Sequence, residues 1–68
     1  MSNEAIISHI AEKEAELKRH QQFAKHVEEL HATHCLKEET MKEIRAKVSS
    51  AIAACEISIR DHQQLLPA

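Results

Sequence analysis

The stretch CLKEETMKE, residues 35–43, determines whether the chain forms one helix or two. Thr40 is followed three residues later by Glu43, which is the spacing of a capping box at the start of a helix. The stretch contains neither glycine nor proline, so the capping box is the single signal of a break. It predicts that one helix ends before this stretch and that a second helix begins at about residue 41.

The rest of the chain favours helix at almost every position. It has no glycine, one proline (Pro67) and one aromatic residue, Phe23, which is too few aromatics for an ordinary sheet core. Alanine, leucine, glutamate and lysine are frequent, and these residues are strong helix formers. We therefore expect an all-α protein with one helical domain over residues 1–68. Its expected parts are a helix over about 4–34, a turn over about 35–40 and a helix over about 41–65.

Apolar residues recur on one stripe of each predicted helix, and a second strip with Ala53, Ala54 and Ile57 follows the C-terminal half. The stripes consist of Ile6, Ile10, Leu17, Ala24 and Val27 in the first helix and of Met41, Ile44, Val48, Ala51, Ile52, Cys55, Ile59 and Leu66 in the second. Such a wide apolar arc indicates contacts on two sides, and a chain of 68 residues buries little surface alone. We predict an antiparallel two-helix hairpin that self-associates as a dimer, with four packed helices. Ile57 is the strongest candidate for a contact with a second subunit or a partner. The full set of residues expected in the assembly is Ile10, Leu17, Val27, Ile44, Val48, Ile52, Cys55, Ile57 and Ile59.

One uninterrupted helix is the alternative to the hairpin. A spacing of seven residues continues through the predicted turn, along Val27, His34, Met41, Val48 and Cys55. A single helix of about 60 residues in a coiled coil would use this repeat. Glu38 and Arg45 would then place charges in the seam between helices and weaken it.

His31, His34 and Cys35 are the residues with spacing suited to a metal, because side chains three and four apart share a helix face. Zinc sites usually take ligands from two separated pairs, and the chain has no Cys-x-x-Cys pair, so we expect no metal and no cofactor. Cys35 and Cys55 would lie too far apart in a hairpin for a disulfide. We expect both to act as small buried apolar side chains.

Three histidines fall at or near the predicted seam: His20, His31 and His34. Imidazole gains a charge near pH 6, and a charged ring in an apolar seam is unfavourable. Mild acid is therefore expected to loosen the assembly.

The balance of nine basic and eleven acidic residues gives a net charge of −2, which provides no general attraction to nucleic acid. No apolar run approaches the length of a membrane span, so we expect no membrane partner and a cytoplasmic location. A two-helix hairpin also lacks a pocket in which a nucleophile and base are oriented, so we expect no catalytic residue. The predicted function is a non-enzymatic regulator or adaptor that contacts another protein.

Two alternatives for the function stay open. The first is an RNA- or DNA-binding regulator, with a basic band formed by Lys18, Arg19, Lys25, Lys42, Arg45 and Lys47. The second is a secretion or assembly co-chaperone, which is also a short helical hairpin.

In size, charge and predicted hairpin, the whole chain resembles the small proteins that regulate plasmid copy number. That resemblance implies a dimer whose two hairpins form a four-helix bundle. The opening residues MSNEAIISHI, 1–10, are similar to those of small early-region accessory proteins of lambda-like temperate phages. This second resemblance implies a protein made early in infection that modulates host or phage development by contacting another protein. Neither resemblance assigns a role to a particular residue.

Overall fold

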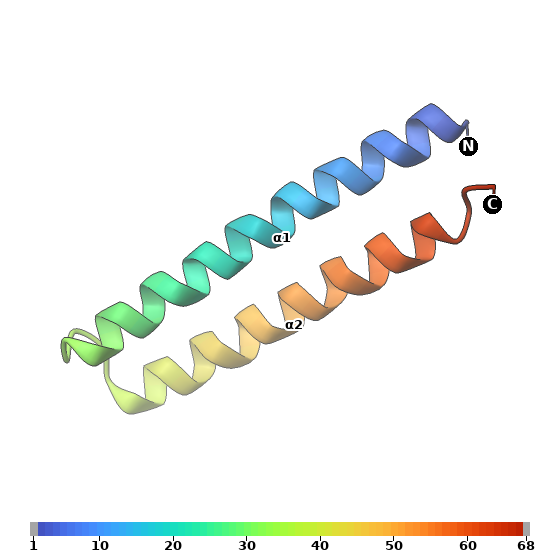
Figure 1. Ribbon diagram of the computed structural model, residues 1–68. Helices are drawn as coiled ribbons and strands as arrows, with labels where there is room; N and C mark the ends of the chain where they lie inside the picture. Colours follow the sequence, from blue (N-terminus) through green and yellow to red (C-terminus); the bar gives the residue numbers. More distant parts are fainter. Residues whose placement is uncertain (1, 68) are drawn as a thin grey trace.

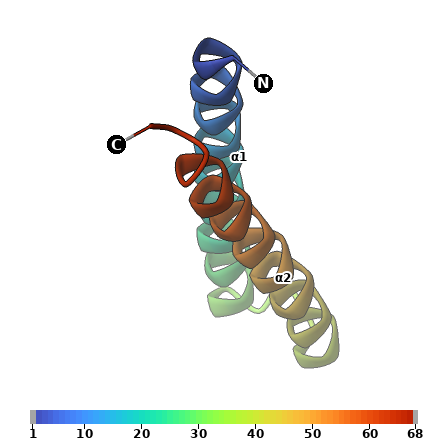
Figure 2. The same ribbon diagram turned by 90° about the vertical axis from the view of Figure 1, so that its right-hand side faces the viewer.

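The computed structural model describes residues 2–67 and contains two helices packed side by side in an antiparallel hairpin (Figure 1). Helix α1 spans Asn3–Ala32 and helix α2 spans Glu38–Gln63. The molecule measures 48 × 16 × 15 Å, with both termini at one end and the turn at the other. Figure 2 shows that α2 is inclined to α1, as expected when ridges of side chains pack into grooves. The predicted all-α hairpin is confirmed, and the alternative of one continuous helix is wrong.

The two helices begin with different caps. Ser2 precedes α1, and its Oγ accepts a hydrogen bond from the backbone N–H of Ala5 at 3.2 Å, as an N-cap serine does. Lys37 precedes α2, and its side chain makes no capping hydrogen bond. The predicted capping box is therefore wrong, because Thr40 lies inside a helix that begins at Glu38 instead of residue 41.

The chain reverses earlier than the sequence predicts, because α1 ends at Ala32 and a residue with a left-handed backbone conformation follows two positions later. His34 has a φ of 62°, and its N–H donates to the carbonyl of His31 at 3.0 Å. The N–H of Cys35 donates to the carbonyl of Leu30 at 2.9 Å. These two bonds form a Schellman motif, which satisfies the last carbonyls of a helix. Glycine usually occupies the left-handed position, and histidine is one of the other residues that tolerates it.

The core is a single seam between the two helices. Met41 is its most enclosed side chain, with no exposed surface. The buried apolar residues all fall on the predicted stripes: Ile6, Ile10, Val27, Met41, Val48 and Cys55. Four large apolar side chains are half exposed or more: Ile7, Phe23, Ile57 and Leu65. Neither described helix has the length and apolar character needed to cross a membrane.

Candidate functional site

The structure places His31, His34 and Cys35 around the turn without bringing them together as metal ligands. The Nε2 atom of His31 lies 2.9 Å from Oε2 of Glu38, which links the end of α1 to the start of α2. The hydrogen bond to His31 lowers the pKa of the Glu38 carboxyl. His34 is exposed, and Cys35 is an exposed free thiol whose Sγ accepts a hydrogen bond from Thr33 at 3.2 Å. The expectation that both cysteines are buried is therefore wrong for Cys35.

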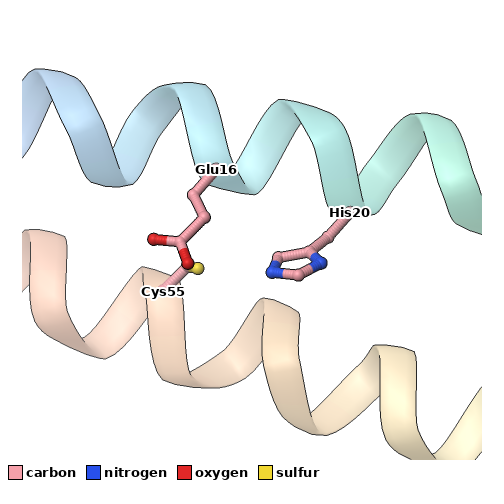
Figure 3. Close-up of side chains that lie close together, drawn as sticks. All are labelled: Glu16, His20 and Cys55. Atoms are coloured by element: carbon pink, nitrogen blue, oxygen red, sulfur yellow. The ribbon is translucent and has the colours of Figure 1, made fainter.

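A different set of side chains meets near the middle of the hairpin. Glu16 and His20 project from α1 toward Cys55 of α2 (Figure 3). One potential ligand atom from each of these three residues lies within 4.8 Å of the other two. This is the one such group of histidine, cysteine and acidic side chains found within residues 2–67. Cys55 is buried in the seam, and Glu16 and His20 are half buried.

The Glu16 carboxylate is held in its charged form by a neighbouring lysine. The Nζ atom of Lys13 donates a hydrogen bond to Oε2 of Glu16 at 3.1 Å. This bond and the lysine charge lower the pKa of Glu16, and the charges of His20 and Arg19 act in the same direction. Among the hydrogen bonds of the described chain, none engages the His20 ring or the Cys55 thiol. Two of the three potential ligands therefore keep their lone pairs available.

The sequence places His20 and Cys55 at the predicted seam, and Glu16 is not among the candidate site residues predicted from it. The four-residue spacing of Glu16 and His20 was a usable signal, because it puts both on one face of a helix. Their meeting with Cys55 depends on the register between the helices, and spacing within one helix does not give that register.

Comparison with known proteins gives no further guide to the function. No family model, curated protein or solved structure matches the chain.

Two apolar hollows lie between the helices, one toward each end of the hairpin. The hollow near the turn has a volume of about 250 Å³ and is lined mainly by Val27, Glu28, Ile44, Arg45, Val48 and Ile52. The hollow near the termini is lined by Ile7, Ile10, Ala11, Glu14, Gln63 and Leu66. Both are shallow depressions along the seam and are not enclosed cavities, so they suit an apolar side chain from a partner better than a buried small molecule.

Both hollows open on the same side of the hairpin. Ile7, Glu14 and Glu28 are seven and fourteen residues apart, so they follow one edge of α1. Ile52 and Leu66 are fourteen residues apart and follow one edge of α2. We call the surface formed by the residues that line the two hollows the groove face.

The residues predicted for the assembly divide between the seam and the surface. Ile10, Val27, Val48 and Cys55 are buried within one chain. Leu17, Ile44, Ile52 and Ile59 are half buried, and Ile57 is 53% exposed. Ile57 follows the buried Cys55 by two residues, or about 200° around the helix, so it lies on the outer side of α2, away from α1. Ile6 and Met41, which lie on the predicted stripes, were missing from the predicted assembly set although both are buried.

The basic residues considered for nucleic acid are spread along the hairpin, and Arg45 among them is paired with an acid. Nε and a terminal nitrogen of Arg45 donate to the two carboxylate oxygens of Glu28, each at 2.8 Å. Arg45 therefore lies level with Glu28, whereas Lys18 and Arg19 lie level with the region of Cys55. Ten residues separate Arg45 from Cys55, which is about 15 Å along a helix. Arg45 is thus separated from Lys18 and Arg19, along the hairpin, by roughly the width of the hairpin.

Proposed function

We propose that the protein is a non-enzymatic adaptor or regulator that acts as a homodimer, in which two hairpins pack their groove faces together as a four-helix bundle. The observation that carries this proposal is the surface area of one chain. Its accessible surface is 5200 Å², whereas a compact monomer of this size exposes about 4300 Å². The excess of about 900 Å² is close to the roughly 800 Å² that each partner buries in a standard protein interface.

The shape of the chain supports the same proposal. Its radius of gyration is 15.5 Å, compared with about 11 Å for a compact domain of equal length. A hairpin this long has one seam, and the sides of that seam stay open to water unless another element covers them. Antiparallel packing of two hairpins would cover one side of each seam with apolar side chains.

A second copy of the chain fits the groove face better than an unrelated surface does. The face carries apolar residues in both hollows, with Ile7, Ile10 and Leu66 in one and Val27, Ile44 and Ile52 in the other. A second hairpin presents the same apolar residues, so its side chains can fill the hollows. A two-fold axis makes such a face complementary to itself. The ion pair of Glu28 with Arg45 would lie at the edge of this interface.

The outer face of α2 is the surface we assign to another protein. It includes Ile57 and Ala53, both exposed and turned away from α1, with the exposed Ala54 at its border. Pairing of two groove faces leaves this surface uncovered. A large apolar side chain with two alanines on the preceding turn provides a shallow contact for a helix or loop of a partner, which is the adaptor role.

Two matched variants test the proposal, because Ile7 and Ile57 are 56% and 53% exposed and are the same residue type. Ile7→Asp places a charge on the groove face, and Ile57→Asp places one on the outer face of α2. Sedimentation equilibrium at micromolar concentration should give a dimer for the parent chain and for Ile57→Asp. Ile7→Asp should weaken self-association at least tenfold while keeping its helical circular dichroism.

The same measurement can contradict the proposal in two ways. A parent chain that sediments as a folded monomer would rule out the dimer. Dissociation caused by Ile57→Asp but not by Ile7→Asp would move the subunit interface from the groove face to the outer face of α2.

A further inference from the structure

We propose that Glu16, His20 and Cys55 form a Zn²⁺ site that links α1 to α2 near the middle of the hairpin (Figure 3). The ligands would be one carboxylate oxygen, one imidazole nitrogen and the thiolate sulfur. A water molecule would complete the fourth position. The site does not depend on self-association, because all three protein ligands come from one chain.

The donor set points to zinc. Zn²⁺ binds thiolate, imidazole and carboxylate together, usually in tetrahedral geometry. A thiolate ligand disfavours Mg²⁺ and Ca²⁺, which prefer oxygen ligands alone. Three protein ligands with one solvent position is an arrangement that zinc proteins use repeatedly.

The geometry needs little change to close around the ion. In a tetrahedral site with zinc bonds of about 2.0–2.3 Å, neighbouring ligand atoms lie roughly 3.4–3.6 Å apart. The potential ligand atoms of Glu16, His20 and Cys55 lie within 4.8 Å of one another. A contraction of about 1 Å therefore suffices. Side-chain torsions of Glu16 and His20 provide it without a shift of the helices, since both are only half buried.

A cation would also use lone pairs that make no hydrogen bond within the described chain. The other buried seam residues are aliphatic apart from the thioether of Met41, whereas here an acid, an imidazole and a thiol meet. Among residues 2–67 no buried side-chain nitrogen or oxygen lacks a hydrogen-bond partner, so the buried group that would gain a partner is the Cys55 thiol. Lys13 partners the Glu16 carboxylate, whereas the ring nitrogens and the sulfur have no hydrogen bond within the described chain. Zinc coordination would use these lone pairs.

The site and the groove face lie on opposite sides of the hairpin. Glu16 follows Ile7 by nine residues, which is about 180° around α1. Dimerisation through the groove face would therefore leave the fourth coordination position open to water. Zinc binding and self-association can be measured, and can fail, separately.

The test uses Co²⁺ as a spectroscopic probe and the two cysteines as a matched pair. The reduced full-length chain is titrated with Co²⁺ near pH 7.5, and the sulfur-to-cobalt charge-transfer band and the visible bands of tetrahedral cobalt are recorded. We expect saturation at one Co²⁺ per chain and displacement by Zn²⁺. Cys35→Ser should leave the charge-transfer band intact, and Cys55→Ser should abolish it.

Two further variants keep the test decisive if the loss of Cys55 unfolds the seam. His20→Gln and Glu16→Gln leave the buried thiol in place, and each should weaken Co²⁺ binding at least tenfold. Zn²⁺ should raise the melting temperature of the parent chain and of Cys35→Ser, but not that of His20→Gln. Absence of a thiolate band in the parent chain would overturn the proposal, as would a band that is lost with Cys35→Ser but kept with His20→Gln.

Discussion

Arg45 reaches from α2 to the Glu28 carboxylate of α1 through two parallel hydrogen bonds of 2.8 Å. Both side chains are about half exposed, at 47% and 52%, so water screens the attraction and the pair adds little to stability. Its two bonds nevertheless fix the direction of both side chains, because the guanidinium and the carboxylate meet in one plane. With the contact between His31 and Glu38, the pair marks which residues of the two helices lie level.

Acidification is expected to remove the contribution of Glu28. The hydrogen bond from Arg45 lowers the pKa of this carboxyl in the folded chain from its ordinary value of 4.5. The unfolded chain therefore takes up the proton more readily, and the pair stabilises the fold fully at pH above that ordinary value. The contribution is lost as the pH falls through the lower pKa of the folded state. Thermal melts at several pH values should show a fall in melting temperature below about pH 4.5.

A neighbouring glutamate provides the control for this prediction. Glu28→Gln should lower the melting temperature slightly at neutral pH and reduce its fall in acid. Glu29→Gln makes the same chemical change one residue away, outside the ion pair, and should leave the acid profile as it is. Identical profiles for the two variants would show that the pair with Arg45 is not the source of the acid sensitivity.

At the scale of the helices, the seam could be predicted from spacing and the turn could not. Every buried apolar residue lies on a stripe that recurs at three, four or seven residues, which is a property of the sequence alone. The turn depends on His34, which adopts a left-handed conformation that sequence patterns associate with glycine. The residues around Thr40 match a capping box, but α2 has already begun before them.

The error in the turn explains why the cluster of Glu16, His20 and Cys55 was not predicted. The predicted turn is centred about two residues later than the observed one. In a hairpin, such a displacement changes by about four residues which position of α1 faces a given residue of α2. Four residues are about one helical turn. Symmetry about the predicted turn at residues 35–40 would place Cys55 level with residue 20 and about one helical turn from Glu16. In the observed hairpin the potential ligand atoms of Glu16, His20 and Cys55 lie together. The candidate site needed the correct register as well as the correct faces.

The left-handed residue at the end of α1 gives a prediction about stability. His34→Gly should stabilise the chain by up to about 1 kcal/mol, because a left-handed conformation costs a residue with a Cβ about 1–2 kcal/mol and glycine recovers part of this. His26→Gly is the matched change in the interior of α1. It should destabilise the chain by roughly 0.5 kcal/mol, since glycine is a poorer helix former than histidine. Urea unfolding followed by circular dichroism measures both, and a loss of stability in His34→Gly would contradict this account of the turn.

At the scale of the whole molecule, the hairpin has three surfaces that differ in chemistry. The groove face is apolar and lies over the seam, the opposite side carries Glu16 and His20, and the outer face of α2 carries Ile57. Each helix packs against only one other helix, so all three surfaces stay exposed in a single chain. The shape that leaves the single chain with excess exposed surface also leaves three separate surfaces exposed, and these are the surfaces on which we propose that a second copy, a metal ion and a partner bind.

Coupling between folding and self-association gives the last prediction. If the groove faces pair, unfolding releases two chains from one dimer, so the melting temperature must rise with protein concentration. A hundredfold dilution should lower the melting temperature of the parent chain by several degrees, and Ile7→Asp should melt at a low temperature that does not change on dilution. His34→Gly acts on the turn of each chain, so it should shift the melting temperature upward at every concentration and keep the dependence on dilution. A parent chain whose melting temperature is constant over this range would be a folded monomer, and the groove face would then need a different occupant.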